Sequence, residues 1–527
     1  MGFSKKLFFI TLFFSLLMES QTTSKDPLGN LGWYFHADLK SWLPQTGLPL
    51  NPFEIAIILI LLVWALRGRR DRRFHFERGL LFWPVVVLAG MLAYGLLWGF
   101  VQSGSDFTKA LFEVRALAYF IAAYFLVGIL FTHRRDLDTL TWVLLIASFL
   151  LGIDCIVRYF VYIPGHFVGD LDYDHEDATM LAFAILLAGA MILLGSTRRQ
   201  KWFALISLPV DILALMVTHR RAGEAALAIG LVFLAVILFR VNKSLFLKIV
   251  PVTALVFSIY LGAYWNCESG TLCQPARAIS SQFGNPDPRD AQSDSYRILE
   301  KEDISLNIQL HDITGLGFGQ PFIFYIDLPN LSFWPFWHYT PHNAILWVWM
   351  DLGMFGFIAF WWLIGSGLYR GGRLIQALSA AGDHKALVLL AAGTGLIMMQ
   401  VSVSYVDLGL TSDRAMLLLG VTFGVIGHLP GILRRSLGKD TPAHTSRWGA
   451  GLAEQPGEVQ VGVLAHVLVT PAETAPANRS ATPFRTRTRP RWEQNGSASQ
   501  PAPSTGSRAS SLRAAQRQSH WAGHEDT

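Results

Sequence analysis

Three short stretches carry the residues of this sequence that could do chemistry. "MVTHRRAGEAAL" (216–227) places Arg220 and Arg221 in a short hairpin between two apolar runs. Arg297 follows in "DSYRILEKED" (294–303), and His342 in "YTPHN" (339–343) stands at the start of another apolar run. A guanidinium presents a planar pair of donors that suits phosphate, and a neutral imidazole can accept a proton from a hydroxyl. These residue types point to phosphate binding combined with acid–base chemistry.

The elements that must position these residues are membrane helices. The chain has 527 residues, of which 52% are hydrophobic and only 15% charged, whereas soluble proteins carry about 25% charged residues. Apolar runs long enough to cross a bilayer core of about 30 Å recur from Leu48 to Leu433. We expect spans near 48–66, 79–101, 110–131, 139–163, 178–195, 202–218, 222–239, 249–264, 342–368, 386–406 and 414–433. The sequence therefore predicts an all-α, polytopic integral membrane protein.

The first 20 residues add a shorter apolar run behind Lys5 and Lys6. It is either a cleaved signal peptide or a first helix, and Met18 and Ser20 fit a small-residue cleavage site poorly, which favours the helix. About 11–12 transmembrane helices result. The expected organisation is an N-terminal hydrophobic segment with a short outer loop (1–47), an N-terminal transmembrane bundle (48–264), a large extracytoplasmic loop (265–341), C-terminal transmembrane helices (342–434) and a disordered cytoplasmic tail (435–527).

The loops between the spans alternate in charge. Those at 67–78, 133–136, 196–201, 240–248, 369–373 and 434–439 are basic. Those between them are acidic or neutral, and 265–341 holds nine Asp and Glu against four Lys and Arg. The positive-inside rule places the basic set in the cytoplasm and the acidic set outside. The Arg220–Arg221 hairpin then lies outside, where it is the one short loop that breaks the charge rule.

Two interpretations of this hairpin remain open. Glu224 follows Arg220 by four residues and Arg221 by three, so local ion pairing on one helical face could neutralise one guanidinium. Charges at the membrane edge are costly and commonly mark a site, which favours an anionic ligand.

The aromatic stretch before the late apolar run has a similar ambiguity. Pro341 and Asn343 are ordinary helix-start residues, so His342 is either a bystander or a proton acceptor on the outer face. Tyr339, Trp334 and Trp337 could stack on sugars or anchor the chain at the membrane interface.

Further residues carry weaker expectations. Asp154 and Arg158 are four residues apart and suit an ion pair, although Arg158 could also line a donor site. Gly315, Gly317 and Gly319 predict a compact turn that folds the outer loop back. A disulfide between Cys267 and Cys273 suits an oxidising outer compartment. A divalent-ion site made by Asp172, Asp174 and Asp177 is an alternative that would favour a metal-dependent mechanism.

Three segments together resemble the O-antigen ligase and O-antigen polymerase superfamily of bacterial membrane glycosyltransferases. "THRRAGEAALAIGLVFL" is similar to its arginine segment, although Arg220 replaces the small residue that normally precedes the arginine. "YRILEKEDISLNIQLHDITGLGFGQ" resembles its loop segment, and "PHNAILWVWMDLGMFGFIAF" its "HNxxLxxLxxxGxxGxxxF" segment. The order of the segments and the large late loop also agree, over roughly Leu48 to Leu433.

This resemblance implies a glycosyltransferase of the bacterial cytoplasmic (inner) membrane, with its active site on the extracytoplasmic face. The donor would be an undecaprenyl-pyrophosphate-linked glycan and the acceptor a hydroxyl of a glycan or lipid-glycan, without a metal, another cofactor or nucleic acid. Arg221 and Arg297 would hold the pyrophosphate, and His342 would act on the acceptor. The expected substrate-binding residues are Arg220, Asn343, Tyr339 and Arg158.

Two other functional classes fit the sequence less well. A transporter or flippase of sugars or lipid-linked glycans would suit about twelve spans, but carriers of this size commonly show two similar halves, which this sequence lacks. A non-catalytic partner in a glycan-assembly complex is a third possibility. Ligase and polymerase share donor chemistry, so the choice between them stays open.

Overall fold

The chain is described here by a computed structural model covering residues 2–17, 37–39, 50–71, 78–162, 175–267, 270–284, 288–332 and 334–440. All these residues belong to one compact unit, Met1–Thr470. Within these ranges the structure contains fourteen α-helices and no β-strand. Ten of the helices are long and apolar enough to cross a membrane. The expected all-α, multi-pass membrane protein is confirmed.

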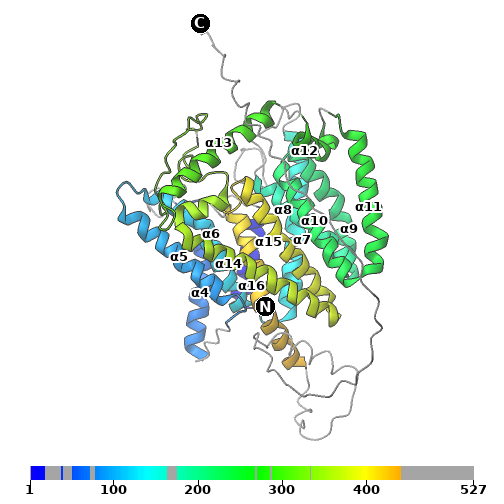
Figure 1. The fold of residues 1–527 in the computed structure, drawn as a ribbon. Helices are drawn as coiled ribbons and strands as arrows, with labels where there is room; N and C mark the ends of the chain where they lie inside the picture. The colour runs from blue at the N-terminus through cyan, green and yellow to red at the C-terminus, as the bar shows by residue number, and fades with distance from the viewer. Residues whose placement is uncertain are drawn as a thin grey trace, which may run out of the picture. The chain divides into compact units, whose positions relative to one another are not determined.

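The helices follow the predicted spans closely (Figure 1). Their bounds are α1 Phe3–Leu16, α4 Pro52–Asp71, α5 Phe82–Val101, α6 Phe107–Leu130, α7 Arg134–Val157, α8 His175–Leu194, α9 Arg198–Val217, α10 Arg221–Val241, α11 Lys243–Tyr264, α12 Gln274–Phe283, α13 Pro288–Leu310, α14 Ala344–Ala380, α15 His384–Val406 and α16 Asp413–Asp440. The ten long apolar helices are α5–α11 and α14–α16. Helix α4 is apolar only over Pro52–Leu66, and α1 has 14 residues, or ~21 Å, so both are shorter than a full span.

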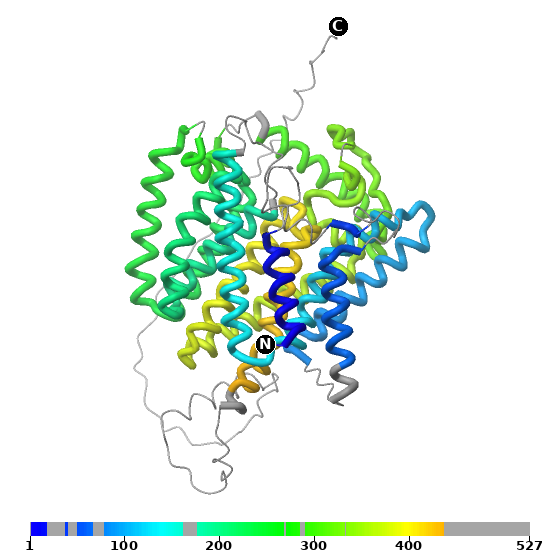
Figure 2. The backbone as a smooth tube through the Cα atoms, turned by 180° about the vertical axis from the view of Figure 1, so that it is seen from behind, coloured from blue at the N-terminus to red at the C-terminus, as the bar shows by residue number. Residues whose placement is uncertain are grey.

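The inner helices of the bundle are α8, α15 and α16, whose apolar windows are at least 83% buried. Glycines let α16 approach α6: a Cβ on Gly420 would lie 2.3 Å from the carbonyl oxygen of Phe120. Small residues commonly serve this purpose between membrane helices. Helix α1 packs against α4, α7 and α16 (Figure 2), whereas α11 lies at the edge with no buried residue.

Ion pairs tie together the helix ends that carry the predicted cytoplasmic loops. Lys5 contacts Asp136 at 2.6 Å, Lys385 contacts Asp138 at 3.1 Å, and Arg134 pairs with Asp383. Helices α12 and α13, which belong to the predicted outer loop, lie at the other end (Figure 1). The structure thus sorts the two sets of loops as the charge alternation predicts, while the assignment of each end to a compartment remains a prediction.

A break in α14 anchors the outer loop in the membrane bundle. Gly353 has φ 66° and ψ −173°, which is not helical. The carbonyl oxygens of Met350 and Asp351 instead accept hydrogen bonds from the backbone N–H groups of Leu316 (2.7 Å) and Gly317 (3.0 Å). Because the turn after α13 is fixed in this way, α13 and the start of α14 are held beside each other.

The compact glycine turn is present as expected. Gly315, Gly317 and Gly319 have φ of 72°, 83° and 82°, a left-handed conformation that glycine adopts without steric cost. The predicted tail differs in one respect, because α16 continues to Asp440 and residues 435–440 are therefore helical. The rest of the tail lies outside the described residues.

Candidate functional site

The α9–α10 hairpin sets the first two arginines at the start of a helix. His219 adopts φ 51°, which closes the turn tightly, and its Nδ1 lies 3.1 Å from Oε1 of Gln274 on α12. Arg220 is the N-cap of α10 and Arg221 its first residue. A helix N-terminus carries partial positive charge, so the backbone and both side chains favour an anion here.

Arg221 pairs across the site rather than along its own helix. Its two terminal nitrogens contact the two carboxylate oxygens of Asp294 on α13 at 2.9 and 3.2 Å, and Asp290 lies 3.6 Å away. Local pairing of Arg221 with Glu224 was therefore the wrong alternative. The Glu224 oxygens have no hydrogen-bond partner among the described residues. The distant pairing arises because α13 folds back over the hairpin.

Arg297 links α13 to the connection between α15 and α16. One guanidinium nitrogen lies 3.8 Å from Asp294, and another lies 3.9 Å from Asp407, whose side chain is fully buried. Asp294 thus lies between Arg221 and Arg297, and a single carboxylate faces both guanidiniums.

His342 lies two residues before α14 and contacts one carboxylate. Its Nδ1 lies 3.1 and 3.2 Å from the two oxygens of Glu300, and its backbone N–H donates to the same carboxylate at 2.9 Å. Burial disfavours the charged imidazole, but the hydrogen bond and charge of Glu300, together with Asp407, outweigh burial and the opposing charge of Arg297. The pKa of His342 is consequently raised above its ordinary value.

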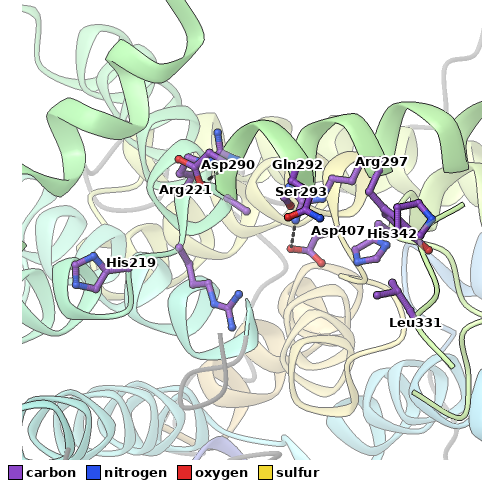
Figure 3. A pocket seen from close by; sticks show the side chains of 13 residues that line it. His219, Arg221, Asp290, Gln292, Ser293, Arg297, Leu331, His342 and Asp407 are labelled. Atoms are coloured by element: carbon purple, nitrogen blue, oxygen red, sulfur yellow. Dashed lines mark ion pairs between the residues drawn. The ribbon is translucent and has the colours of Figure 1, made fainter. Parts of the chain in front are cut away.

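The arginines and His342 line one cavity of about 370 Å³ (Figure 3). Its lining residues are His219, Arg220, Arg221, Ala222, Asp290, Gln292, Ser293, Tyr296, Arg297, Pro329, Leu331, His342 and Asp407. In Figure 3, Arg221 lies beside Asp290, and Arg297 reaches Asp407 near His342. The structure therefore brings together Arg220, Arg221, Arg297 and His342, four of the seven residues expected in the site.

The other three expected residues do not line this cavity. Asn343 caps α14, because its Oδ1 accepts a hydrogen bond from the backbone N–H of Leu346 at 3.0 Å. The Tyr339 ring lies 5.7 Å from the Lys109 ammonium on α6. Arg158 is buried at the end of α7, where Arg158–Tyr162 forms a turn of π-helix.

The two tryptophans considered for sugar stacking contribute to a small apolar cluster. Trp337 is buried and donates a hydrogen bond from Nε1 to the Tyr296 hydroxyl at 2.8 Å. Trp334 packs at the edge of the same cluster.

One of the three aspartates considered for a divalent-ion site is engaged in a buried ion pair. Asp177 binds Arg414 at 2.6 Å, and both side chains are buried. Asp172 and Asp174 lie outside the described residues. Within the described part of the chain, no group of three or more His, Cys, Asp or Glu side chains is arranged to hold a metal. In the outer loop Cys267 and Cys273 form a disulfide.

Sequence reasoning missed the acidic residues of the site. Asp290, Asp294 and Arg297 are spaced i, i+4 and i+7 on α13, and Glu300 follows three residues later. This spacing places the three acidic residues near the same face of the helix as Arg297. The sequence did contain that signal. Asp407 follows α15 with no comparable pattern around it.

Neither models of known protein families nor the sequences of characterised proteins match this chain. The resemblance to the O-antigen ligase and polymerase superfamily therefore stays a prediction from the three sequence motifs.

Proposed function

We propose that this protein is a membrane glycosyltransferase that transfers or polymerises a glycan carried by undecaprenyl pyrophosphate, as O-antigen ligases and polymerases do. One observation carries the proposal. Arg220 and Arg221, Arg297 and His342 come from three segments far apart in the sequence, each with its own motif, and they line the same cavity.

The arginines suit the pyrophosphate of such a donor. Arg221 already makes a two-point contact with a carboxylate, and phosphate oxygens accept the same planar pair of donors. Asp294 is 41% exposed and can turn toward solvent when a phosphate takes its place. Arg297 and Arg220 would then add positive charge where the leaving phosphate gains negative charge, which is electrostatic stabilisation of the transition state.

His342 suits the acceptor. In the proposed step the acceptor hydroxyl oxygen forms a bond to the anomeric carbon of the donor sugar, and the bond from that carbon to the phosphate oxygen breaks. The bonding electrons leave with the lipid pyrophosphate, and the hydroxyl proton passes to the neutral imidazole, which later releases it to water. A single displacement of this kind inverts the anomeric centre.

The predicted topology puts this cavity on the extracytoplasmic face of the bacterial inner membrane. A donor with a polyprenyl chain would stay in the bilayer while its pyrophosphate reaches the cavity. The acceptor would be a hydroxyl of a second glycan or of a lipid-glycan.

Transfer by the purified protein separates an enzyme from a carrier. We expect the full chain in detergent, without any ion gradient, to move a labelled glycan from purified lipid-linked donor onto an added acceptor. A protein that moves the intact lipid-linked glycan across a sealed vesicle, and forms no new glycosidic bond with any of the acceptors, would instead be a flippase.

A further inference from the structure

Glu300 is an almost fully buried charged group beside His342, which lines the cavity. Its side chain is 2% exposed and lies on α13, one turn after Arg297. It accepts hydrogen bonds from the backbone N–H of His342 (2.9 Å) and from the Tyr296 hydroxyl (3.2 Å). The Tyr296 hydroxyl in turn accepts from Trp337 Nε1 at 2.8 Å. The Glu300 carboxylate is therefore held in place by hydrogen bonds other than its contact with the imidazole of His342.

The imidazole contact has a defined direction. Glu300 faces Nδ1 of His342 at 3.1 and 3.2 Å, so that nitrogen carries the proton when the ring is neutral. The lone pair then resides on Nε2, the ring nitrogen that does not contact Glu300, and His342 itself lines the cavity.

We propose that Glu300 is a positioning residue for the transfer reaction: it selects the imidazole tautomer of His342 and stabilises the imidazolium that forms when the acceptor proton arrives. This inference depends on the proposed function, because it assigns the acceptor proton to His342. A buried acid that orients a histidine base, and balances its charge during the reaction, plays the same part in hydrolases with catalytic triads.

The charges around His342 set the direction of its pH dependence. Glu300 and Arg297 approach from α13, and Asp407 approaches from the α15–α16 connection. Both acids raise the pKa of His342 and Arg297 lowers it, with a net rise. A base must be neutral to act, so kcat/KM should increase with pH through a midpoint above the ordinary imidazole value of 6.5.

The test compares Glu300→Gln with Glu302→Gln, which removes an exposed carboxylate two residues away. We expect Glu300→Gln to move the acid limb of kcat/KM to lower pH and to reduce kcat by roughly 10- to 1000-fold, with KM for the donor little changed. Glu300→Asp should recover part of both effects, and Glu302→Gln should match the wild type. If Glu300 were merely structural, Glu300→Gln would lower activity without shifting the acid limb of the kcat/KM profile.

Tyr296→Phe gives a second test with the opposite sign. It removes one hydrogen bond from Glu300, concentrates charge on the carboxylate and should move the limb to higher pH. This variant and Glu300→Asp carry the test if Glu300→Gln does not insert into the membrane.

A readout without turnover distinguishes this inference from the proposed function. Diethyl pyrocarbonate reacts with neutral imidazole, so the pH dependence of His342 modification, followed by peptide mass spectrometry, reports its protonation directly. We expect the midpoint to fall in Glu300→Gln and to rise in Tyr296→Phe. Equal midpoints in both variants and the wild type overturn the role of Glu300. If the midpoints shift but the protein never transfers glycan, the result supports the effect of Glu300 on His342. It then contradicts only the proposed glycosyltransferase function.

Discussion

At the scale of single residues, Arg221 is the side chain whose geometry matches its expected ligand most closely. Both terminal nitrogens contact two oxygens of one carboxylate, at 2.9 and 3.2 Å. Lysine cannot reproduce such a contact, because its ammonium is a point charge without a planar pair of donors.

Replacing Arg221 with lysine should therefore slow transfer while the protein inserts normally. Loss of one charge-assisted hydrogen bond costs about 1.5–3 kcal/mol, or roughly 10- to 150-fold in rate. The measurement is the initial transfer rate per inserted protein. Arg370→Lys changes an exposed arginine of α14 at the end predicted to be cytoplasmic. It is the matched control and should keep the full rate. A wild-type rate in Arg221→Lys would mean that charge alone suffices.

At the scale of elements, the glycine turn and the broken α14 form one joint. A Cβ on Gly353 would lie 2.1 Å from the carbonyl oxygen of Ile313, and a Cβ on Gly315 would lie 2.4 Å from that of Asp351. The backbones touch at both points, so neither glycine has room for a side chain. This joint holds α13, which carries Arg297, next to the helix that follows His342.

Gly353→Ala should loosen that joint. Its backbone conformation suits glycine almost alone, which costs about 1–3 kcal/mol in another residue, and the clash with Ile313 adds to this. We expect a lower thermal unfolding midpoint in detergent and a lower transfer rate. Gly365→Ala lies in the same helix with no atom within 4 Å of the new Cβ, and should be neutral or slightly stabilising. Equal midpoints for the two variants would show that the break does not constrain the fold.

The sequence predicted the elements better than the contacts between them. Hydropathy located all ten long apolar helices, because each depends on its own residues, and Pro341 and Asn343 marked the start of α14. It also predicted a span at 48–66 and a first helix, but α4 and α1 are shorter than a full span. The partners of Arg221 and His342 could not be predicted in this way. Asp294 is 73 residues from Arg221 and Glu300 is 42 from His342, so their meeting depends on how the outer loop folds. The contacts of Asn343 with the start of α14 and of Tyr339 with Lys109 could not be predicted for the same reason, and a substrate-binding role for either residue stays a prediction.

At the scale of the whole molecule, the charges of the loops divide between the two ends of the helices. The cavity lies at the end that carries α12 and α13, opposite the cluster of Lys5, Asp136 and Asp383. A positively charged hairpin at the acidic end runs against the insertion bias, which is understandable if it binds an anion.

Cysteine labelling should show this orientation. We expect Glu302→Cys to react with a membrane-impermeant thiol reagent added outside intact cells, and Arg199→Cys to react only after the membrane is opened. Both positions are exposed, while Cys155 is buried and Cys267 and Cys273 are joined, so the native cysteines do not interfere. Labelling of both positions from the same side would contradict the predicted topology and the outward-facing site.

In the proposed site the arginines bind the donor pyrophosphate and His342 acts only on the acceptor. The measurement that tests this assignment most directly is donor binding and transfer in the same preparations of purified wild type, His342→Ala and Arg221→Ala. We expect His342→Ala to bind lipid-linked donor with nearly wild-type affinity and to transfer roughly 10²–10⁴-fold more slowly, whereas Arg221→Ala should lose donor affinity as well. Full transfer by His342→Ala, or unchanged donor binding by Arg221→Ala, would contradict it.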